Sequence, residues 1–394
     1  MSVHRADASY MHLALRLAQR AMGRTSPNPM VGAILVKSGR IIGQGYHRKA
    51  GSPHAEVEAL RQAGRRARGS TLYVTLEPCN HAGRTSPCCD AILAAGVTRV
   101  VAATRDPNPI TNGRGFARLR RAGIDVVTGV FQAAAGRLNA PFWSVMTTGL
   151  PWVVAKIGQS LDGKIATARG EARWITSSAA RRVGHHWRGR VDAVLVGINT
   201  VLQDDPLLTA RGVRQRAGHP IKVIVDSRLR TPATARCLSA QPPAPTIVAA
   251  TRTPEAARAR LERRGAEVVT LPARRGRVPL ARLFRWLARR GVQSILIEGG
   301  GEVLAGALAE RLVHRVIVFI APMLIGGRTA PTSVGGPGVA RLAQAIRLDD
   351  VTHRRVGPDL CVEARVVYPR HNRSPRSTPA RLSYLPGRAV HGPR

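Results

Sequence analysis

The sequence predicts an α/β protein with two layered domains and a separate C-terminal tail. Its 394 residues, 44% of them hydrophobic, are enough for two packed cores. In both halves, short strand-like apolar runs alternate with stretches that have helical periodicity. Between the halves, Pro141, Gly149 and Pro151 interrupt this pattern, so we place a domain boundary near residue 148. We therefore expect domains at 1–148 and 149–369.

The expected elements can be assigned in order along the chain. The first 24 residues have the Leu, Ala and Met spacing of an amphipathic helix. In the first half, strands are expected at 31–37, 40–47, 70–76 and 99–104, and helices at 54–66, 88–96, 115–123 and 131–138. In the second half, β-rich runs cover 152–158, 192–202, 221–227, 245–251, 294–301 and 315–324, with helical stretches between several of them. The tail, 370–394, is rich in Arg, Pro, Ser and Gly without an apolar period, which is typical of disorder.

Cysteine content and hydropathy indicate a protein of a reducing compartment. Five cysteines in so long a chain do not resemble the disulfide framework of a small secreted domain. The N-terminal stretch lacks the apolar segment and cleavage site of a signal peptide, and no run approaches the ~18 apolar residues of a membrane span. We expect a soluble, cytoplasmic protein with no membrane partner.

The charge is unusual for a globular protein. Lys and Arg number 61 against 23 Asp and Glu, giving +38, which raises the question of a nucleic-acid partner. However, the arginines are spread over most of the predicted helices and do not gather in one patch, and aromatic residues, which stack on single strands, make up only 4%. We favour solvated arginine-rich faces over a nucleic-acid surface, and we expect some arginines to bind phosphorylated small substrates. The oligomeric state is left open, with a homo-oligomer as one alternative.

A set of zinc-type ligands lies in the first half. His54 opens a predicted helix behind Pro53, and Cys79 and Cys88 each follow a proline. A catalytic zinc takes three protein ligands of this kind and keeps a fourth position for water. Cys88 begins a helix, where unpaired N–H groups favour the thiolate. Each residue alone is more simply read as a helix cap or a small buried side chain, but together they predict a zinc site.

Glu56 completes the signature of the zinc-dependent nucleobase deaminases, in which the glutamate of H-x-E transfers protons and is not a ligand. The usual second part, P-C-x-x-C, is modified here, because eight residues separate Cys79 from Cys88. The longer loop brings in His81 and Arg84, which could reach a substrate. Cys89 is interpreted as an inert buried thiol.

Four segments resemble the bifunctional deaminase/reductase family of riboflavin biosynthesis. They are SPNPMVGA, GYHRKAGSPHAEVEAL, YVTLEPCNHAGRTSPCCDAI and RDPNPITNGRG, and the longer ligand loop is this family's own form of the motif. The resemblance implies a cytidine-deaminase-like three-layer fold and, as substrate, a diaminopyrimidinone that carries a ribosylamino 5-phosphate. Asn28, in the first segment, is then a candidate base contact, although an asparagine also suits a turn.

The second half lacks G-x-G-x-x-G after its first strand, which argues against a Rossmann domain. Instead, SILIEGGGEVLAGALAE passes from a strand through three glycines into a helix, an arrangement that can bind phosphates. VAKIGQSLDGKIA, GEARWITS, GINTVLQDDPLLTAR and VIVDSRLRTP resemble the reductase half of the same family over about residues 150–368. That resemblance implies a fold similar to dihydrofolate reductase.

The resemblance also implies residue roles in the second half. The cofactor contacts are Gly158, Trp174, Thr200, Asp204, Ser227 and the 300–306 turn, including Gly300, Gly301 and Glu302. The contacts to the phosphorylated sugar are Ala172, Arg188, Leu208, Arg211 and Glu298. Position 172 departs from the family pattern, where we expect Ser. Each of these residues also has a purely structural interpretation: core for Trp174, solvated surface for Arg188, and a turn for Asp204.

Hydride transfer requires alignment of the nicotinamide and a proton source. Lys156 and Asp204 are the candidates, alongside Glu56 as the catalytic residue of the first site. Ser227, Arg228 and Arg230 suit the 2′-phosphate of NADPH. Zn²⁺ and NADPH are therefore the expected cofactors. The alternatives are a tRNA or single-stranded nucleic-acid deaminase and a non-catalytic zinc-stabilised RNA-binding protein; Glu56 argues against the second, because a structural zinc needs no proton shuttle.

Overall fold

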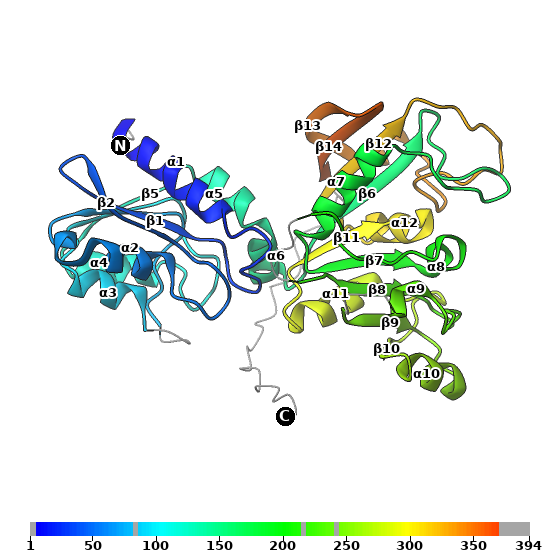
Figure 1. Cartoon of the computed structure of the whole chain (residues 1–394), viewed down its shortest axis with the longest axis horizontal. Coiled ribbons are helices and arrows are strands. Elements are labelled where there is room, and N and C mark those ends of the chain that lie inside the picture. Colours follow the sequence, from blue (N-terminus) through cyan, green and yellow to red (C-terminus); the bar gives the residue numbers. More distant parts are fainter. Residues whose placement is uncertain (1–4, 82–85, 214–217, 240–243, 370–394) are drawn as a thin grey trace.

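Two β-sheets, each covered by helices, form the molecule (Figure 1). The structure, a computed structural model, describes residues 5–81, 86–213, 218–239 and 244–369. The predicted tail, 370–394, lies outside the described residues, as does Arg84. None of the described helices has the length and apolar character that crossing a bilayer requires.

The N-terminal domain has a five-stranded sheet in the order β2-β1-β3-β4-β5. Its strands are β1 (Gly32–Lys37), β2 (Arg40–Tyr46), β3 (Thr71–Val74), β4 (Arg99–Ala102) and β5 (Asp125–Thr128). Its helices are α1 (Arg5–Gln19), α2 (Ala55–Ala63), α3 (Cys88–Ala94), α4 (Arg114–Arg121), α5 (Gln132–Leu138) and α6 (Ala140–Thr148), with a 3₁₀ turn, η1 (Gly64–Ala67). β1 is antiparallel to both neighbours, whereas β3, β4 and β5 run parallel.

The centre of the sheet is buried on both faces because β1, β3 and β4 are apolar at consecutive positions. In β1, Ala33 and Leu35 pack with the side chains of α2, α3 and α4. Ile34 and Val36, which point the opposite way, pack with α1 and α5. The result is three layers, and the buried strand β3 carries the chain directly to Cys79 at the edge of the sheet.

The C-terminal domain has a nine-stranded sheet in the order β10-β9-β8-β7-β11-β6-β12-β14-β13. Its strands are β6 (Trp152–Ser160), β7 (Ala193–Gly197), β8 (Ile221–Val225), β9 (Thr246–Ala250), β10 (Ala266–Thr270), β11 (Ser294–Glu298), β12 (Arg315–Ala321), β13 (Arg347–Val356) and β14 (Asp359–Val367). Its helices are α7 (Ser178–Arg188), α8 (Ile198–Asp204), α9 (Arg236–Ser239), α10 (Glu255–Glu262), α11 (Leu280–Arg289) and α12 (Gly301–Ala309), with a 3₁₀ turn, η2 (Leu342–Gln344).

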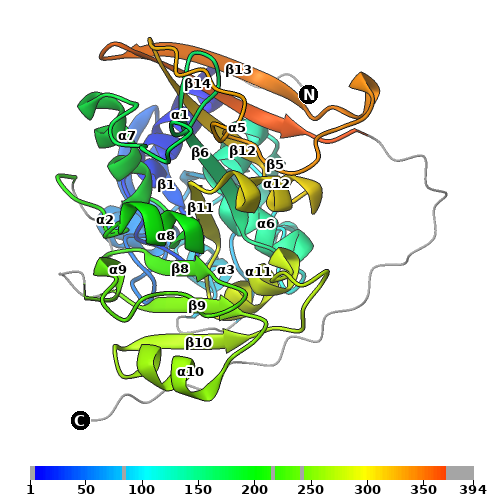
Figure 2. The ribbon, with the colours of Figure 1, turned by 90° about the vertical axis from the view of Figure 1, so that its right-hand side faces the viewer.

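The strands from β10 to β12 are parallel. Only β14 runs in the opposite direction, antiparallel to β12 and to β13, with which it forms a hairpin at one edge (Figure 2). The central strand β11 is buried at every position, as expected for a parallel strand covered on both faces. Helices α11 and α12 pack on one face, and α7, α8, α9 and α10 pack on the other. The carboxyl ends of β6, β7, β8 and β11 consequently meet along one edge, where ligands bind in open α/β sheets.

Two sequence expectations need correction. The run 192–202 was expected to be β-rich, but α8 replaces the strand after Gly197, because the chain turns at the end of β7. Pro141 does not interrupt the chain; it occupies the first turn of α6, where a missing N–H is tolerated. Gly149 ends that helix with a positive φ of 68°. The predicted boundary near 148 thus coincides with the last residue of α6.

Candidate functional sites

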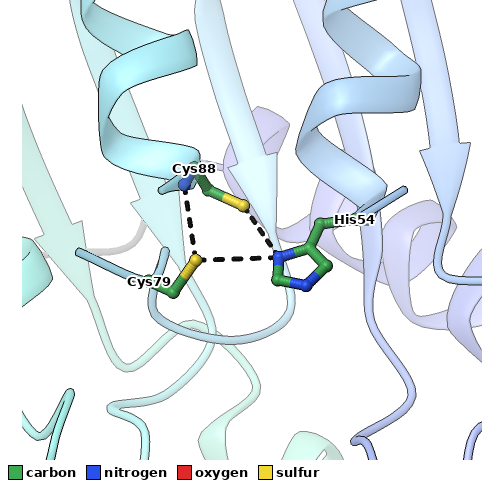
Figure 3. A group of neighbouring side chains, drawn as sticks. All are labelled: His54, Cys79 and Cys88. Atoms are coloured by element: carbon green, nitrogen blue, oxygen red, sulfur yellow. Dashed lines mark hydrogen bonds between the residues drawn. The ribbon is translucent and has the colours of Figure 1, made fainter. Parts of the chain in front are cut away.

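The predicted zinc ligands lie together at one edge of the N-terminal sheet (Figure 3). His54 Nδ1 is 3.0 Å from Cys88 Sγ and 3.6 Å from Cys79 Sγ, and the three donor atoms lie within 4.8 Å of one another. Tetrahedral zinc, with bonds of about 2.0–2.3 Å, needs donors roughly 3.5 Å apart. One nitrogen and two sulfurs at these separations fit a zinc ion with a fourth position left for water.

Three local features position the donors. His54 has extended backbone and caps the N-terminus of α2. Cys79 follows β3, and Cys88 is the first residue of α3, directly after Pro87. The Cys88 backbone N–H donates to Cys79 Sγ at 3.3 Å. Hydrogen bonding by Cys88, together with His54, lowers the pKa of Cys79, which favours the thiolate form of this sulfur.

Glu56 lies on the first turn of α2, beside the donors but not among them. Its side chain is buried, 4% exposed, and burial raises the pKa of its carboxyl to about 7. A group with a pKa near the working pH can both accept and release a proton. The geometry therefore supports the predicted proton transfer by Glu56.

Asn28 is held beside this site by His47, a residue that the sequence interpretation did not assign. Asn28 Nδ2 lies 3.1 Å from His47 Nε2, and His47 Nδ1 lies 3.1 Å from the Pro53 carbonyl. The His47 ring is 5.5 Å from the His54 ring. The sequence did contain a signal for His47, because this residue lies in GYHRKAGSPHAEVEAL, the same family-like segment as His54.

A second unassigned residue, Glu77, braces the ligand loop. Its two carboxylate oxygens accept four backbone N–H bonds of 2.8–3.2 Å from the segment between Asp106 and Phe116. Of the residues at the loop, His81 Nδ1 lies 3.5 Å from Thr111 Oγ1. The thiol of Cys89 is buried and donates to the Pro78 carbonyl, while burial raises its pKa to about 12, which agrees with an inert thiol.

In the C-terminal domain, a glycine turn follows β11. Gly299 and Gly300 have φ values of +79° and +81°, which side chains rarely adopt, and Gly300 begins α12 without a side-chain cap. A Cβ on Gly299 would lie 3.1 Å from Thr200 Oγ1, so Thr200 is adjacent to the turn. The uncapped helix N-terminus leaves backbone N–H groups for a phosphate, which fits a dinucleotide.

The remaining predicted cofactor contacts differ in their exposure and in the residues that they contact. Trp174 is 66% exposed and stacks under Arg181, whose guanidinium carbon is 4.1 Å from the ring centre, so the core interpretation of Trp174 is wrong. Gly158 approaches Thr176, and Ser227 Oγ accepts the Val278 N–H. Glu302 pairs with Arg277 at 2.9 Å, and Gly301 packs against Thr332. Arg230 donates to Asn199 near the start of α8.

A group of charged side chains lies where the end of β11 pairs with the middle of β6. Lys156 and Glu298 are register partners on these parallel strands. Arg188 forms two hydrogen bonds to Glu298, of 2.9 and 2.5 Å, and a third to the Thr209 carbonyl. Burial lowers the pKa of Lys156, and the neighbouring Glu298 carboxylate opposes that shift. The surface interpretation of Arg188 is therefore wrong.

The other predicted substrate contacts lie close to Arg188 in sequence or space. Leu208 is buried with φ +55°, and Arg211 is exposed, with its N–H 3.2 Å from His185 Nδ1. Burial raises the pKa of Asp204, whose carboxylate lies 3.8 Å from the guanidinium of Arg173. The half-buried Ala172 is the residue before Arg173 in the chain. His185, not assigned from the sequence, has its pKa lowered to about 4 by burial and by Arg188 and Arg211.

Comparison with known families covers both domains. Residues 151–362 match the RibD C-terminal domain, and residues 4–104 match the cytidine and deoxycytidylate deaminase zinc-binding region. A riboflavin biosynthesis protein RibD from Escherichia coli is 45% identical over 368 residues, covering 90% of this chain and 98% of the relative. The protein of the same name from Aquifex aeolicus is 43% identical over 356 residues, covering 90% and 97%.

Solved structures agree with these matches. RibD from Acinetobacter baumannii superposes with a TM-score of 0.84 at 38% identity, covering 92% of this chain and 99% of that one. A diaminohydroxyphosphoribosylaminopyrimidine deaminase/5-amino-6-(5-phosphoribosylamino)uracil reductase from Thermotoga maritima gives a TM-score of 0.80 at 34% identity, with the same coverage. The likeness spans both domains, which neither nucleic-acid-binding alternative accounts for.

Proposed function

This chain belongs to the RibD family of riboflavin-biosynthesis proteins, and we propose from that premise how its residues divide the two reactions. It is a bifunctional enzyme. The first reaction is hydrolytic deamination of 2,5-diamino-6-(5-phosphoribosylamino)pyrimidin-4(3H)-one. The second is NADPH-dependent reduction of the ribosyl group of 5-amino-6-(5-phosphoribosylamino)uracil to ribityl. We assign deamination to residues 1–148 and reduction to residues 149–369.

In the deaminase site, His54, Cys79 and Cys88 hold the zinc. When bound, the ion would lower the pKa of a water molecule, so that hydroxide is available near neutral pH. Glu56 takes the proton that this water releases and passes it to the ring nitrogen, while the hydroxide oxygen bonds to the amine-bearing carbon. Glu56 then takes the proton of the new hydroxyl and gives it to the amine, so that the carbon–nitrogen bond breaks, a carbonyl forms and ammonia leaves. Burial of Glu56 supports this role, because its raised pKa suits both directions of transfer.

Asn28 and His47 orient the pyrimidine. The amide of Asn28 offers both a donor and an acceptor to the base, and His47 fixes the amide through its ring nitrogen. Because His47 also contacts the Pro53 carbonyl, the orientation of Asn28 is tied to the start of α2, where His54 and Glu56 stand.

In the reductase site, the cofactor is held by Gly158, Trp174, Thr200, Asp204, Ser227 and the turn with Gly300, Gly301 and Glu302. When bound, NADPH would supply a hydride to the anomeric carbon of the ribosyl group, whose bond to the ring oxygen breaks. The N-terminus of α12 binds its phosphates, and Thr200 lies at the same turn. Ser227 and Arg230, beyond the end of β8, provide a hydroxyl and a guanidinium for the 2′-phosphate.

The sugar phosphate of the substrate contacts the charged group formed by Lys156, Arg188 and Glu298, with Ala172 and Leu208 at its boundary. Arg211 is exposed and free of a carboxylate partner among the ion pairs of the described residues, so it suits the phosphate. Glu298 holds Arg188 in place. Lys156 or Asp204 protonates the oxygen that becomes the new hydroxyl; burial weakens the hold of Lys156 on its proton.

One observation carries the two-site assignment: the His54, Cys79 and Cys88 donors lie beside buried Glu56 in a domain separate from the one that matches the RibD reductase. The test is a coupled assay on the zinc-loaded chain. We expect ammonia release from the diaminopyrimidinone without NADPH, and loss of NADPH absorbance only after deamination. Ammonia release that required NADPH would contradict the assignment.

A further inference from the structure

The turn that carries Asn28 contacts the reductase domain directly. Gln293, the residue before β11, donates from Nε2 to the Pro27 carbonyl at 2.7 Å. Ser26 Oγ lies 3.5 Å from the Gly291 carbonyl. Gly23 also approaches the reductase domain, because a Cβ there would lie 2.9 Å from the Gly189 carbonyl. Residues from both sides of the domain boundary therefore surround the 23–28 segment.

Gln293 is itself rigidly held. It is 4% exposed, its N–H donates to Asp192 Oδ2 at 2.9 Å, and its carbonyl accepts the Trp152 N–H at 2.7 Å. Asp192 also accepts the Ser294 N–H and hydroxyl. The side-chain amide of Gln293 can therefore act as a fixed donor, since the backbone N–H and carbonyl of Gln293 are both hydrogen-bonded.

The far side of the same turn is anchored within the N-terminal domain. Asn139, between α5 and α6, accepts the Met30 N–H at 2.7 Å and donates to the Met30 carbonyl at 2.9 Å. A small cavity of about 50 Å³ separates the two anchors and is lined by residues of both domains, among them Asn28, Asn139 and Gln293. The turn that carries Asn28 is thus held by hydrogen bonds from both domains, to Asn139 on one side and to Gln293 on the other.

We propose that Gln293 is a positioning residue for deamination: a side chain of the reductase domain holds the turn that presents Asn28 to the pyrimidine. The inference rests on the proposed role of Asn28. If the Pro27 contact is lost, the turn samples other conformations, and the apparent affinity falls by the fraction that remains competent. Chemistry at Glu56 and the zinc ligands is not touched, because none of them contacts Gln293.

The test compares Gln293→Met in the full zinc-loaded chain with the parent. Methionine keeps the volume and removes the donor. A neutral hydrogen bond typically contributes about 1 kcal/mol, so we expect the deaminase KM to rise roughly fivefold to tenfold while kcat stays within about twofold. Reduction of pre-deaminated substrate should be unchanged. Gln344→Met, an exposed glutamine of the same domain bonded to the Arg341 N–H, is the matched control and should leave both reactions unchanged.

Hydrogen exchange of residues 25–31 reads the turn without any catalytic assay. We expect about fivefold to tenfold faster exchange in Gln293→Met than in the parent, and the same rate in Gln344→Met. Unchanged exchange and KM in a folded Gln293→Met protein would overturn the proposal, as would equal loss of both activities. If exchange is faster in Gln293→Met but the parent itself releases no ammonia, the proposed function alone is refuted. Gln293→Ala, which also opens a cavity, repeats the test if the methionine variant does not fold.

Discussion

Arg188 on α7 and Glu298 at the end of β11 form a buried, two-pronged ion pair. Burial would raise the pKa of Glu298, but Arg188 and Lys156 outweigh it and hold that pKa below its ordinary value. The Glu298 carboxylate therefore fixes the orientation of Arg188, which we propose as a substrate contact. Arg188 has a carboxylate partner, whereas Arg211 has none among the ion pairs of the described residues, and we propose that Arg211 binds the phosphate.

Replacing Glu298 by Gln should destabilise the reductase domain, since it leaves Arg188 as an uncompensated buried cation. Breaking one side of a buried pair typically costs about 3–5 kcal/mol. The measurement is the midpoint of thermal unfolding. Glu267→Gln is the matched control, because Glu267 forms an exposed pair with Arg290, and exposed pairs contribute about 0–1 kcal/mol. Equal effects of the two substitutions would contradict the buried-pair interpretation.

Stability should fall between pH 6.5 and pH 4 through His185. Its pKa in the folded protein is lowered to about 4, by burial and then by Arg188 and Arg211, while the unfolded value is near 6.5. In this window the unfolded chain binds the proton and the folded one does not, so protonation favours unfolding. We expect the unfolding midpoint to drop less between pH 7 and pH 5 in His185→Gln than in the parent. Identical drops would show that the folded-state pKa of His185 is ordinary.

Zinc content should distinguish two adjacent cysteines. Cys88 contributes a donor 3.0 Å from His54 Nδ1, whereas the Cys89 thiol donates to the Pro78 carbonyl and lies among buried apolar residues. We expect about one zinc per chain in the parent and in Cys89→Ser, and a large loss in Cys88→Ser. Metal analysis after dialysis against a weak chelator provides the measurement. Loss in Cys89→Ser with retention in Cys88→Ser would mean that the ligand assignment is off by one residue.

The zinc site could be predicted from the sequence because its chemistry is carried by residue type and local position. His54, Cys79 and Cys88 each stand at a helix start or strand end, and the topology brings those ends to one edge. Glu77 and His47 could not be derived in the same way. Glu77 depends on backbone N–H groups between Gly113 and Phe116, and His47 depends on the side-chain amide of Asn28. Tertiary packing decides the approach of both segments.

The fold shows the same division. Strands with continuous apolar sequence, such as β7 and β11, were predicted, whereas β13, which is almost entirely exposed, was not. An exposed edge strand has no apolar pattern to mark it. The contact between Gln293 and Pro27 joins residues 266 positions apart and leaves no local trace in the sequence. Separate consideration of the two halves could not reveal it.

The two reactions should be separable by substitution, because the zinc site and the glycine turn after β11 lie on different sheets. Glu56→Ala removes the proton-transferring group and none of the metal donors, so fold and zinc should persist. Loss of a general acid/base typically costs about 10²–10⁴-fold, and deamination should fall at least that far, because this carboxyl serves several transfers. NADPH oxidation with pre-deaminated substrate should stay within a few-fold of the parent. Arg211→Ala should do the reverse, weakening reduction through a lost phosphate contact and leaving deamination intact. Loss of both reactions in a folded, zinc-containing Glu56→Ala protein would favour one shared active site over two.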